Sequence, residues 1–320
     1  MKALRDLVFG PMRAVRAGLG ALIAATVERF ASLEPPFVRA GRALARRSRL
    51  GGGVYWFAQE SLIKRLRRSG HRYREVTIRH HHVYVDVTDP TGRYSFFYGD
   101  AYEKAVVDAV ITALKPGDVF LDIGANIGYF STVAARRVGA SGHVVAFEPH
   151  ERARADLRAM TVRNEVQQIV EIVPCAVGDR EEDLTLYTAD EGTAYSTLDP
   201  AGSPMRHTLA FRPSTVVKAT SLDAWLARRP ELAARVRCIK IDVEGAESRV
   251  VSGMTRTLLP IGVTILCETH IGSDADTMLE RAGFRRHRIE RGSSPHGNFL
   301  YVRPPESAVS RARDRRQSVP

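Results

Sequence analysis

One stretch of the chain, residues 119–128 (VFLDIGANIG), constrains the fold more than any other. Its apolar run Val119–Ile123 is typical of a parallel strand buried on both faces. The run breaks into small, turn-tolerant residues, and a helical pattern follows. A strand, a tight turn and a helix start form half of a nucleotide-binding βαβ unit. We therefore expect a ligand or neighbouring backbone to approach the turn Gly124–Gly128 closely, with Asn126 tolerating left-handed backbone.

The second half of this unit follows directly. After a helix that ends near Arg137, residues 143–149 (HVVAFEP) are predicted to form a second buried strand that closes on Glu148 and a proline. An acid about 20 residues beyond a glycine turn is spaced to accept both hydroxyls of an adenosine ribose. The spacing therefore predicts Glu148 as a ribose-binding residue.

The α/β alternation continues beyond this unit. A helix is expected over residues 152–163, and a third strand over residues 169–177 ends at Gly178-Asp179. Asp179 is then placed to touch the adenine of a ligand held on the first two strands, although a turn aspartate explains the same spacing. Residues 180–219 are expected to hold a short hairpin and a long polar loop that shapes a site.

Residues 236–247 (VRCIKIDVEGAE) are the second most informative stretch. An apolar strand carries Lys240, and Asp242, Glu244 and Glu247 crowd its exit. These charges cannot all be core residues, because an unpaired buried charge costs several kcal/mol. In a doubly wound sheet this strand lies beside the glycine turn, which favours a functional role. The simpler alternative is that Asp242 pairs with Lys240 while Glu247 charges the next helix start.

The strand over residues 262–267 is also followed directly by polar residues, namely Glu268, Thr269 and His270. Glu268 and His270 are expected at the carboxyl-end crevice or its rim. His270 is a candidate general base at neutral pH, and Glu268 a candidate for orienting it or the substrate. A lone histidine after a strand is as often a rim residue. A helix over 274–282 and an antiparallel pair over 284–290 and 298–302 complete the pattern.

The net charge of +11 belongs to the ends of the chain. Residues 1–80 contain 17 Lys/Arg against 5 Asp/Glu, residues 303–320 carry a net +3, and residues 81–302 are left with −4. Basic ends suit anionic lipid or nucleic acid, while an arginine-rich bias on solvated helix faces gives the same composition. No run in residues 1–33 approaches the ~20 apolar residues that span a bilayer, so a peripheral amphipathic helix is the membrane hypothesis.

Composition divides the chain into four expected segments. These are a basic helical extension over residues 1–53 that closes on a Gly51–Gly53 hinge, a β-rich lead-in over 54–100, an α/β domain over 101–303 and a disordered tail over 304–320. Three cysteines in apolar runs, Cys175, Cys238 and Cys267, predict buried reduced thiols and a cytoplasmic protein, peripheral to the membrane if its basic end binds lipid.

The lead-in is expected to contain paired strands over 76–79 and 82–87, with a turn at 89–92. His80–His82 attract attention as metal ligands. Adjacent residues on a strand point to opposite faces, so three consecutive histidines cannot easily meet one ion. We therefore expect a solvated strand end there, followed by an amphipathic helix over 101–114.

Together these stretches resemble the FkbM family of S-adenosylmethionine-dependent methyltransferases. The motifs that carry the resemblance are, in chain order, Asp122–Gly128 (DIGANIG), Phe147–Pro149 (FEP), Ala176–Asp179 (AVGD), Thr220–Asp223 (TSLD) and Lys240–Glu247 (KIDVEGAE), followed by Glu268. The resemblance covers about residues 95–303 and says nothing of residues 1–70.

The resemblance implies a class I methyltransferase fold, an α/β Rossmann-like architecture with a seven-stranded, mostly parallel sheet and helices on both faces. The implied cofactor is S-adenosyl-L-methionine. Its methionine part would lie on Asp122, Gly124, Ala125, Asn126 and Gly128, its ribose hydroxyls on Glu148 and its adenine amino group on Asp179. Family members mostly methylate oxygen atoms, often on sugars or natural products, which implies a small-molecule or glycan acceptor.

The acids at the strand exits suit this chemistry. Methyl transfer is an in-line displacement from a sulfonium, so the enzyme aligns the acceptor oxygen and accepts the proton of an alcohol. We expect Asp242 or Glu268 to accept that proton and Glu244 and Lys240 to position the acceptor, with His270 as a further candidate. Acid clustering alone does not specify a divalent ion, and we expect no metal.

Two other classes of protein were weighed against this interpretation. A NAD(P)-dependent oxidoreductase or epimerase would carry a Gly-x-Gly-x-x-Gly turn and a Tyr-x-x-x-Lys pair, whereas Gly124 and Gly128 are separated by Ala-Asn-Ile. A nucleic-acid-binding module would interleave aromatic residues with its charges, and the aromatics of residues 1–70 are mostly scattered. We therefore expect no specific nucleic-acid partner, and membrane contact is the better use of the basic end.

Overall fold

The computed structural model describes residues 15–303 apart from 16, 28–33, 48, 71, 80, 100–102, 190–191 and 291–292. The expectation for the tail, residues 304–320, lies outside this range. The chain divides into two compact units, Met1–Tyr102 and Glu103–Pro320. Across the described residues, no helix is both long and apolar enough to cross a membrane.

The first unit is mainly helical. Its elements are a helix over residues 17–27, α2 (Glu34–Arg47), α3 (Arg49–Ser69), the antiparallel strands β1 (Tyr73–Ile78) and β2 (His81–Asp86), and α4 (Pro90–Tyr98). The predicted pair of strands is confirmed. Phe37, Tyr55 and Phe97 form an aromatic cluster with ring centroids 5.4–6.5 Å apart, which joins α2, α3 and α4.

Three local predictions in this unit have different outcomes: two are wrong and one agrees with the structure. The hinge at Gly51–Gly53 is wrong, because α3 runs through all three glycines. A glycine costs a helix only about 1 kcal/mol, and buried residues further along α3 hold the helix in place. The turn at 89–92 is instead a helix start, where the Asp89 side chain accepts from the Thr91 N–H at 2.9 Å. His82 lies on an exposed strand end, 2.6 Å from Glu75.

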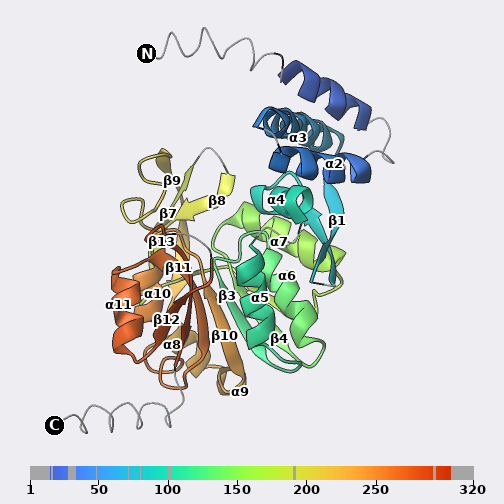
Figure 1. Ribbon diagram of the computed structural model, residues 1–320. Coiled ribbons are helices and arrows are strands. Elements are labelled where there is room, and N and C mark those ends of the chain that lie inside the picture. Colours follow the sequence, from blue (N-terminus) through green and yellow to red (C-terminus); the bar gives the residue numbers. More distant parts are fainter. Residues whose placement is uncertain are drawn as a thin grey trace, which may run out of the picture. The chain divides into compact units, whose positions relative to one another are not determined.

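The second unit is built on a seven-stranded sheet with strand order β12-β13-β11-β10-β3-β4-β5 (Figure 1). The strands are β3 (Val119–Ile123), β4 (His143–Phe147), β5 (Val170–Val173), β10 (Val236–Ile241), β11 (Thr264–His270), β12 (Arg285–Arg288) and β13 (His296–Val302). β13 runs antiparallel to both of its neighbours, and the other pairs are parallel. This arrangement confirms the predicted class I methyltransferase sheet.

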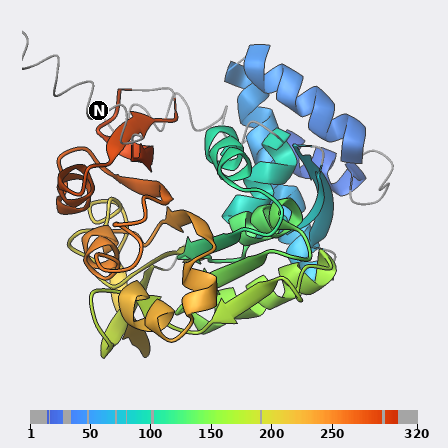
Figure 2. The same ribbon diagram turned by 90° about the horizontal axis from the view of Figure 1, so that it is seen from below.

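Helices cover both faces of this sheet, as Figures 1 and 2 show. They are α5 (Lys104–Ala113), α6 (Tyr129–Val138) and α7 (Glu151–Arg163) on one face, and α8 (Leu222–Ala227), α10 (Glu247–Ser252) and α11 (Asp274–Arg281) on the other, with the short α9 (Pro230–Ala233) beside α8. Successive residues of β3 feed two separate cores: Leu121 packs under α8 and α10, and Phe120 packs under α5 and α6. Burial on both faces explains why the residues of this strand other than Asp122 are apolar.

Two predictions about the later strands are wrong. The single strand over 169–177 is split at Pro174, which has no N–H for the ladder: β5 stays in the large sheet, while β6 (Ala176–Val177) joins a second sheet. Residues 180–219 contain the predicted hairpin, as β7 (Glu182–Ala189) and β8 (Gly192–Thr197), but the end of the predicted long loop is a strand, β9 (Phe211–Thr220). These strands and β6 form the second sheet, with order β6-β9-β7-β8. Its pairings join distant residues, such as Glu182 with Ala219, which no local pattern reveals.

A third difference concerns β11. The sequence predicts that this strand ends at Cys267, but it continues to His270 because β13 pairs with it that far. Glu268 lies opposite Asn298, and His270 lies opposite His296. The polar residues at this strand exit are therefore held in a regular ladder, with fixed directions, rather than in a loop.

Candidate active site

The glycine turn sits at the carboxyl end of β3, as predicted. The N–H groups of Gly124 and Ala125 both donate to the Phe147 carbonyl at 3.0 Å, and Asn126 has φ +47°, which confirms the left-handed residue. At Gly124, with φ +81°, an added Cβ would lie 1.9 Å from the Asp242 carbonyl oxygen. At Gly128, with φ +83°, it would lie 2.1 Å from Leu157 Cδ1. Close packing within the protein therefore requires both glycines.

Asp122 is the penultimate residue of β3 and is almost fully buried. The residue is 1% exposed, and its Oδ2 accepts from Ser131 Oγ at 2.6 Å. Its Oδ1 is buried and has no hydrogen-bond partner among the described residues. Burial raises the pKa of Asp122, and the charge of Lys240 opposes that shift. A buried acceptor of this kind is suited to a polar ligand group that the protein itself does not supply.

Glu148 follows β4 and lines a pocket beside the turn. Its Oε1 accepts from the His150 N–H at 2.7 Å, and its Oε2 accepts from the Asn126 N–H at 2.8 Å. Burial raises the pKa of Glu148 to about 7, although both hydrogen bonds lower it. Each carboxylate oxygen keeps a further lone pair for a ligand hydroxyl.

This first pocket is narrow, with a cavity volume of about 50 Å³. Its polar lining includes Asn126, Glu148, Thr197, Asp242 and Glu244. Its apolar lining comes from Ile123, Phe147, Cys175, Val177 and Leu186. An apolar wall beside a carboxylate fits a nucleoside, whose base is flat and whose ribose presents two hydroxyls.

Asp179 lies outside the residues that line this pocket. Arg249 of α10 donates to its Oδ1 from Nε at 2.8 Å and from Nη2 at 2.6 Å. These hydrogen bonds hold the pKa of Asp179 below its usual range. Asp179 thus pairs with Arg249 in the structure, and its contact with the adenine amino group stays a prediction.

Lys240 and Asp242 form the centre of the predicted acid-rich exit. Lys240 is 4% exposed, its Nζ lies 2.8 Å from Asp242 Oδ2, and it lies 4.6 Å from the centre of the Phe130 ring. Burial lowers the pKa of Lys240, but the charges of Asp242 and Asp122 outweigh it and raise the pKa. The register of the sheet places Lys240 directly opposite Asp122. A charged lysine therefore sits between two carboxylates.

Several further acids around this pair have raised pKa values. Burial, with the charge of Asp242, raises the pKa of Glu244 to about 8 and that of Glu268 to about 9. Glu244 has φ +55°, and its buried Oε2 has no partner among the described residues. Burial, with the charge of Glu290, raises the pKa of Glu103 to about 7. Acids therefore crowd this site, and the charge of a cationic ligand would favour their ionised forms.

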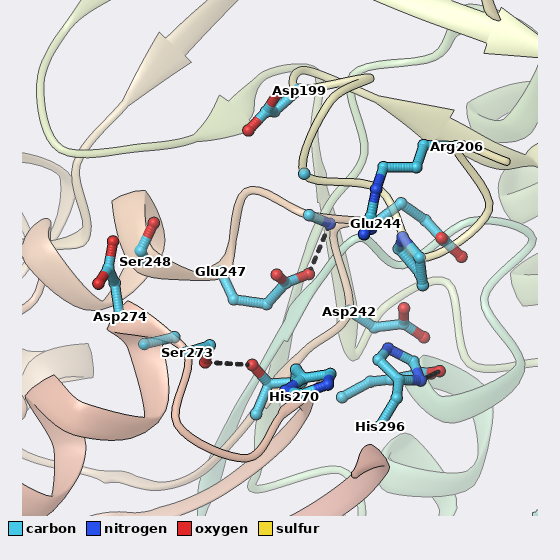
Figure 3. Close-up of a pocket in the computed structure, with 16 residues that line it drawn as sticks. Asp199, Arg206, Asp242, Glu244, Glu247, Ser248, His270, Ser273, Asp274 and His296 are labelled. Atoms are coloured by element: carbon cyan, nitrogen blue, oxygen red, sulfur yellow. Dashed lines mark hydrogen bonds and ion pairs between the residues drawn. The ribbon is translucent and has the colours of Figure 1, made fainter. Parts of the chain in front are cut away.

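A second pocket, also lined by Asp242 and Glu244, has a cavity volume of about 410 Å³, within the usual range for small-molecule sites (Figure 3). Its charged and histidine side chains are Asp199, Arg206, Asp242, Glu244, Glu247, Glu268, His270, Asp274 and His296. Glu247 Oε1 accepts from the Gly245 N–H at 2.9 Å, which matches the predicted helix-start role. Asp242 and Glu244 line both pockets, so the two cavities meet at the exit of β10.

His270 and His296 stand at the rim of the second pocket. His270 is exposed and its Nδ1 donates to the Ile271 carbonyl at 2.8 Å, which leaves Nε2 facing outward from that bond. His296 Nδ1 lies 3.8 Å from Glu268 Oε1, and burial lowers the pKa of His296. The sheet register brings these two histidines opposite each other.

Sequence reasoning missed Glu103, Glu290, Arg206 and Asp199 as members of this region. Glu103 precedes α5 with φ +45°, and no sequence pattern marks that strained position. Glu290 accepts from the side chain of Asn298 at 3.2 Å, a contact that needs the β12–β13 pairing. Among the described residues, no group of three or more His, Cys, Asp or Glu side chains is arranged to hold a metal ion.

Comparisons with known proteins agree with this geometry. The methyltransferase FkbM domain matches residues 122–286, more than half of the chain. The 31-O-demethyl-FK506 methyltransferase FkbM of Streptomyces tacrolimicus is 29% identical over 202 residues, covering 56% of this chain and 75% of that protein. The hexuronic acid methyltransferase AglP of Haloferax volcanii is 25% identical over 172 residues, covering 54% and 64%.

A solved structure of methyltransferase FkbM from Methylobacillus flagellatus covers 68% of this chain and 54% of its own chain, with 12% identity and a TM-score of 0.39. The sheet order, the turn at β3 and the pocket beside Glu148 define a class I methyltransferase. The chain belongs to the FkbM family of S-adenosyl-L-methionine-dependent methyltransferases. It is an enzyme, and S-adenosyl-L-methionine is its methyl donor.

Proposed function

We propose that this enzyme methylates a hydroxyl oxygen of a sugar, a glycan or a natural product, and that the reaction takes place at the exit of β10. One observation carries the proposal: Asp242 and Glu244 line both the pocket beside Glu148 and the larger acidic pocket. A methyl donor in the first cavity and an acceptor in the second would meet at these two carboxylates. The names of the Streptomyces and Haloferax relatives, which specify an O-methyl position and a hexuronic acid, agree with an oxygen acceptor.

The first pocket supplies the groups that the donor requires. Glu148 would accept the ribose hydroxyls, and Ile123, Phe147 and Val177 would cover the adenine. The turn Gly124–Gly128 and the unpartnered Oδ1 of Asp122 would hold the amino acid part. S-adenosyl-L-methionine supplies an electrophilic methyl carbon on a positively charged sulfur. The surplus of carboxylates at the β10 exit favours that charge.

Asp242 is the proposed general base. Lys240 holds its Oδ2 at 2.8 Å, and Oδ1 has no hydrogen-bond partner among the described residues. Oδ1 would take the proton of the acceptor hydroxyl, and Lys240 would keep the carboxylate in position. Glu268 is less suited to this task, because its pKa of about 9 leaves it protonated at neutral pH. It would instead donate a hydrogen bond that orients the acceptor.

The second pocket indicates the charge of the acceptor. Six acidic side chains line it, from Asp199, Asp242, Glu244, Glu247, Glu268 and Asp274, against the guanidinium of Arg206. Glu244 and Glu268, with pKa values of about 8 and 9, are mostly protonated at neutral pH, but the other four acids still outnumber Arg206. An anionic acceptor would be repelled by this lining. We therefore propose a neutral, hydroxyl-rich acceptor, which the carboxylates would bind through hydrogen bonds from its hydroxyl groups.

The test uses S-adenosyl-L-methionine labelled in its methyl group. Small-molecule and glycan extracts of the source cells are separated by ion exchange into cationic, neutral and anionic fractions, and each is incubated with the enzyme. Labelled methyl ether in the neutral fraction, absent with Asp242→Asn, is the expected result. Label on nitrogen or carbon would contradict O-methylation, and label confined to the anionic fraction would contradict the proposed acceptor charge.

A further inference from the structure

The helix over residues 17–27 carries an apolar face that no described residue covers. Val15 is 71% exposed, Leu19 47% and Leu22 66%. These positions are four and three residues apart, so they form one stripe along the helix. Residues 17–27 (AGLGALIAATV) contain no charged side chain. A helix face that meets water normally carries charged or polar residues, so this stripe is unusual for a solvated surface.

The opposite face of the helix is buried against the rest of the first unit. Gly20, Ala24 and Val27 are buried. A Cβ added at Gly20 would lie 2.7 Å from Phe57 Cβ and from the Ala58 nitrogen, so the helix packs closely on α3 at that point. Since this contact fixes the rotation of the helix, Leu19 and Leu22 cannot turn inward. The exposed stripe is therefore a consequence of the packing.

The unit that carries this stripe is strongly basic. Residues 1–80 carry 17 Lys/Arg against 5 Asp/Glu, and Arg39 and Lys64 have exposed side chains on α2 and α3. Trp56, also on α3, is 45% exposed. An uncharged apolar stripe on a strongly basic unit is the pattern of helices that lie in the interface of an anionic membrane.

We propose that the stripe Val15–Leu19–Leu22 docks this protein on the surface of an anionic lipid bilayer. The apolar side chains would enter the boundary between headgroups and acyl chains, and the basic residues would be attracted to the headgroups. The uncharged segment has 11 residues, against the ~20 needed to cross a bilayer, so the helix lies on the surface. A second copy of the chain would bring an identical basic unit, and like charges oppose that contact.

The experiment is flotation of the full chain with vesicles. One set consists of phosphatidylcholine, and the other of phosphatidylcholine mixed with phosphatidylglycerol. The protein is expected to float with the anionic vesicles at low salt and less at high salt. The double variant Leu19→Gln/Leu22→Gln should lower this partitioning about tenfold or more, because it removes the apolar insertion. Both side chains are exposed, so its thermal unfolding should match that of the wild type.

Val216→Gln is the matched control, because it changes an exposed apolar side chain (65% exposed) in the second unit and should leave flotation unchanged. Three results would overturn the proposal. The first is equal flotation of the double variant and the wild type, which would show that charge alone accounts for the binding. The second is equal binding to neutral vesicles. The third is a dimer without lipid that the double variant converts to a monomer, which would make the stripe a contact between copies.

Discussion

Glu148→Gln gives the sharpest test of the donor site. The carboxylate accepts from two N–H groups, at 2.7 and 2.8 Å, and offers its remaining lone pairs to the pocket. A glutamine has one acceptor oxygen, so one ribose hydroxyl would lose its charged acceptor and one N–H would face an NH₂ group. A hydrogen bond to a charged group contributes about 1.5–3 kcal/mol. The Kd for S-adenosyl-L-methionine should therefore rise roughly 10- to 150-fold.

The same substitution should change the pH dependence of binding. Burial places the pKa of Glu148 at about 7, above its ordinary value of 4.5, so the free protein holds a proton there below pH 7. Donor binding favours the ionised form, so wild-type affinity should fall about tenfold per pH unit below 7 and level off above it. Glu148→Gln should abolish that slope. A remaining rise in affinity near pH 8 would belong to Glu244, whose pKa is about 8.

The pKa of Glu148 also predicts the stability of the free protein. An acid with a raised pKa contributes stability that is complete below its unfolded value of 4.5 and is lost as pH rises through 7. The shift of about 2.5 units corresponds to about 3 kcal/mol of unfolding free energy. Glu148→Gln should flatten that part of the profile.

Isothermal titration calorimetry measures both the Kd and the protons released on binding, when it is repeated in buffers of different ionisation enthalpy. Glu151→Gln is the control, since it removes an exposed carboxylate three residues away and should behave as the wild type. A Kd for Glu148→Gln within about threefold of the wild type, or an unchanged pH slope, would refute the role of Glu148.

Three further predictions concern neighbouring residues. Asp242→Asn should leave the donor Kd within about threefold and reduce single-turnover methyl transfer at least ~100-fold, and a normal rate would remove Asp242 from the chemistry. Gly124→Ala should lower the free energy of unfolding in urea by roughly 2–4 kcal/mol, because its Cβ would meet the Asp242 carbonyl at 1.9 Å. Asp223→Ala should cost about 3–5 kcal/mol in the same assay, since the buried carboxylate accepts from Arg256 and Thr257, and an unchanged midpoint would contradict that anchoring role.

Asp223 belongs to a motif whose structural role the sequence reveals only in part. Thr220–Asp223 (TSLD) is part of the family resemblance; the sequence predicts a helix cap at Ser221 or Thr220 and assigns no role to Asp223. In the structure, Ser221 caps α8 by accepting from the Ala224 N–H at 3.1 Å, and Asp223 binds the backbone after α10. The motif thus anchors two helices on one face of the sheet.

The elements that the sequence predicted well are those whose signal is local. The run Val119–Ile123, the turn that follows it and Glu148 after β4 can each be identified from a few neighbouring residues, because burial on both faces of a parallel strand requires continuous apolar side chains. The same reasoning placed Asp242 at the strand exit beside the turn, where the sheet order puts it.

The predictions that were wrong depended on contacts between distant residues. Pro174 marks a break, but the sequence does not say that β6 then pairs with β9 in another sheet. The ion pair between Asp179 and Arg249, which lies 70 residues further along the chain, was likewise absent from the sequence predictions. The glycines at 51–53 suggested a hinge because glycine destabilises a helix at its own position. The packing that keeps α3 helical involves residues elsewhere in the chain, which the sequence does not reveal.

The sequence by itself determined the class of this protein through the alternation of strands and helices, the glycine turn after β3 and the acids that follow β10. Only the tertiary structure decided the environment of those acids, because burial and mutual proximity set their pKa values. It also placed Asp242 and Glu244 in the lining of both pockets. It also decided that Leu19 and Leu22 face outward, since the close approach of Gly20 to α3 fixes the rotation of their helix. The sequence gives the chemical identity of each residue, but the electrostatic environment of a residue depends on its distances from residues that are far away in the sequence.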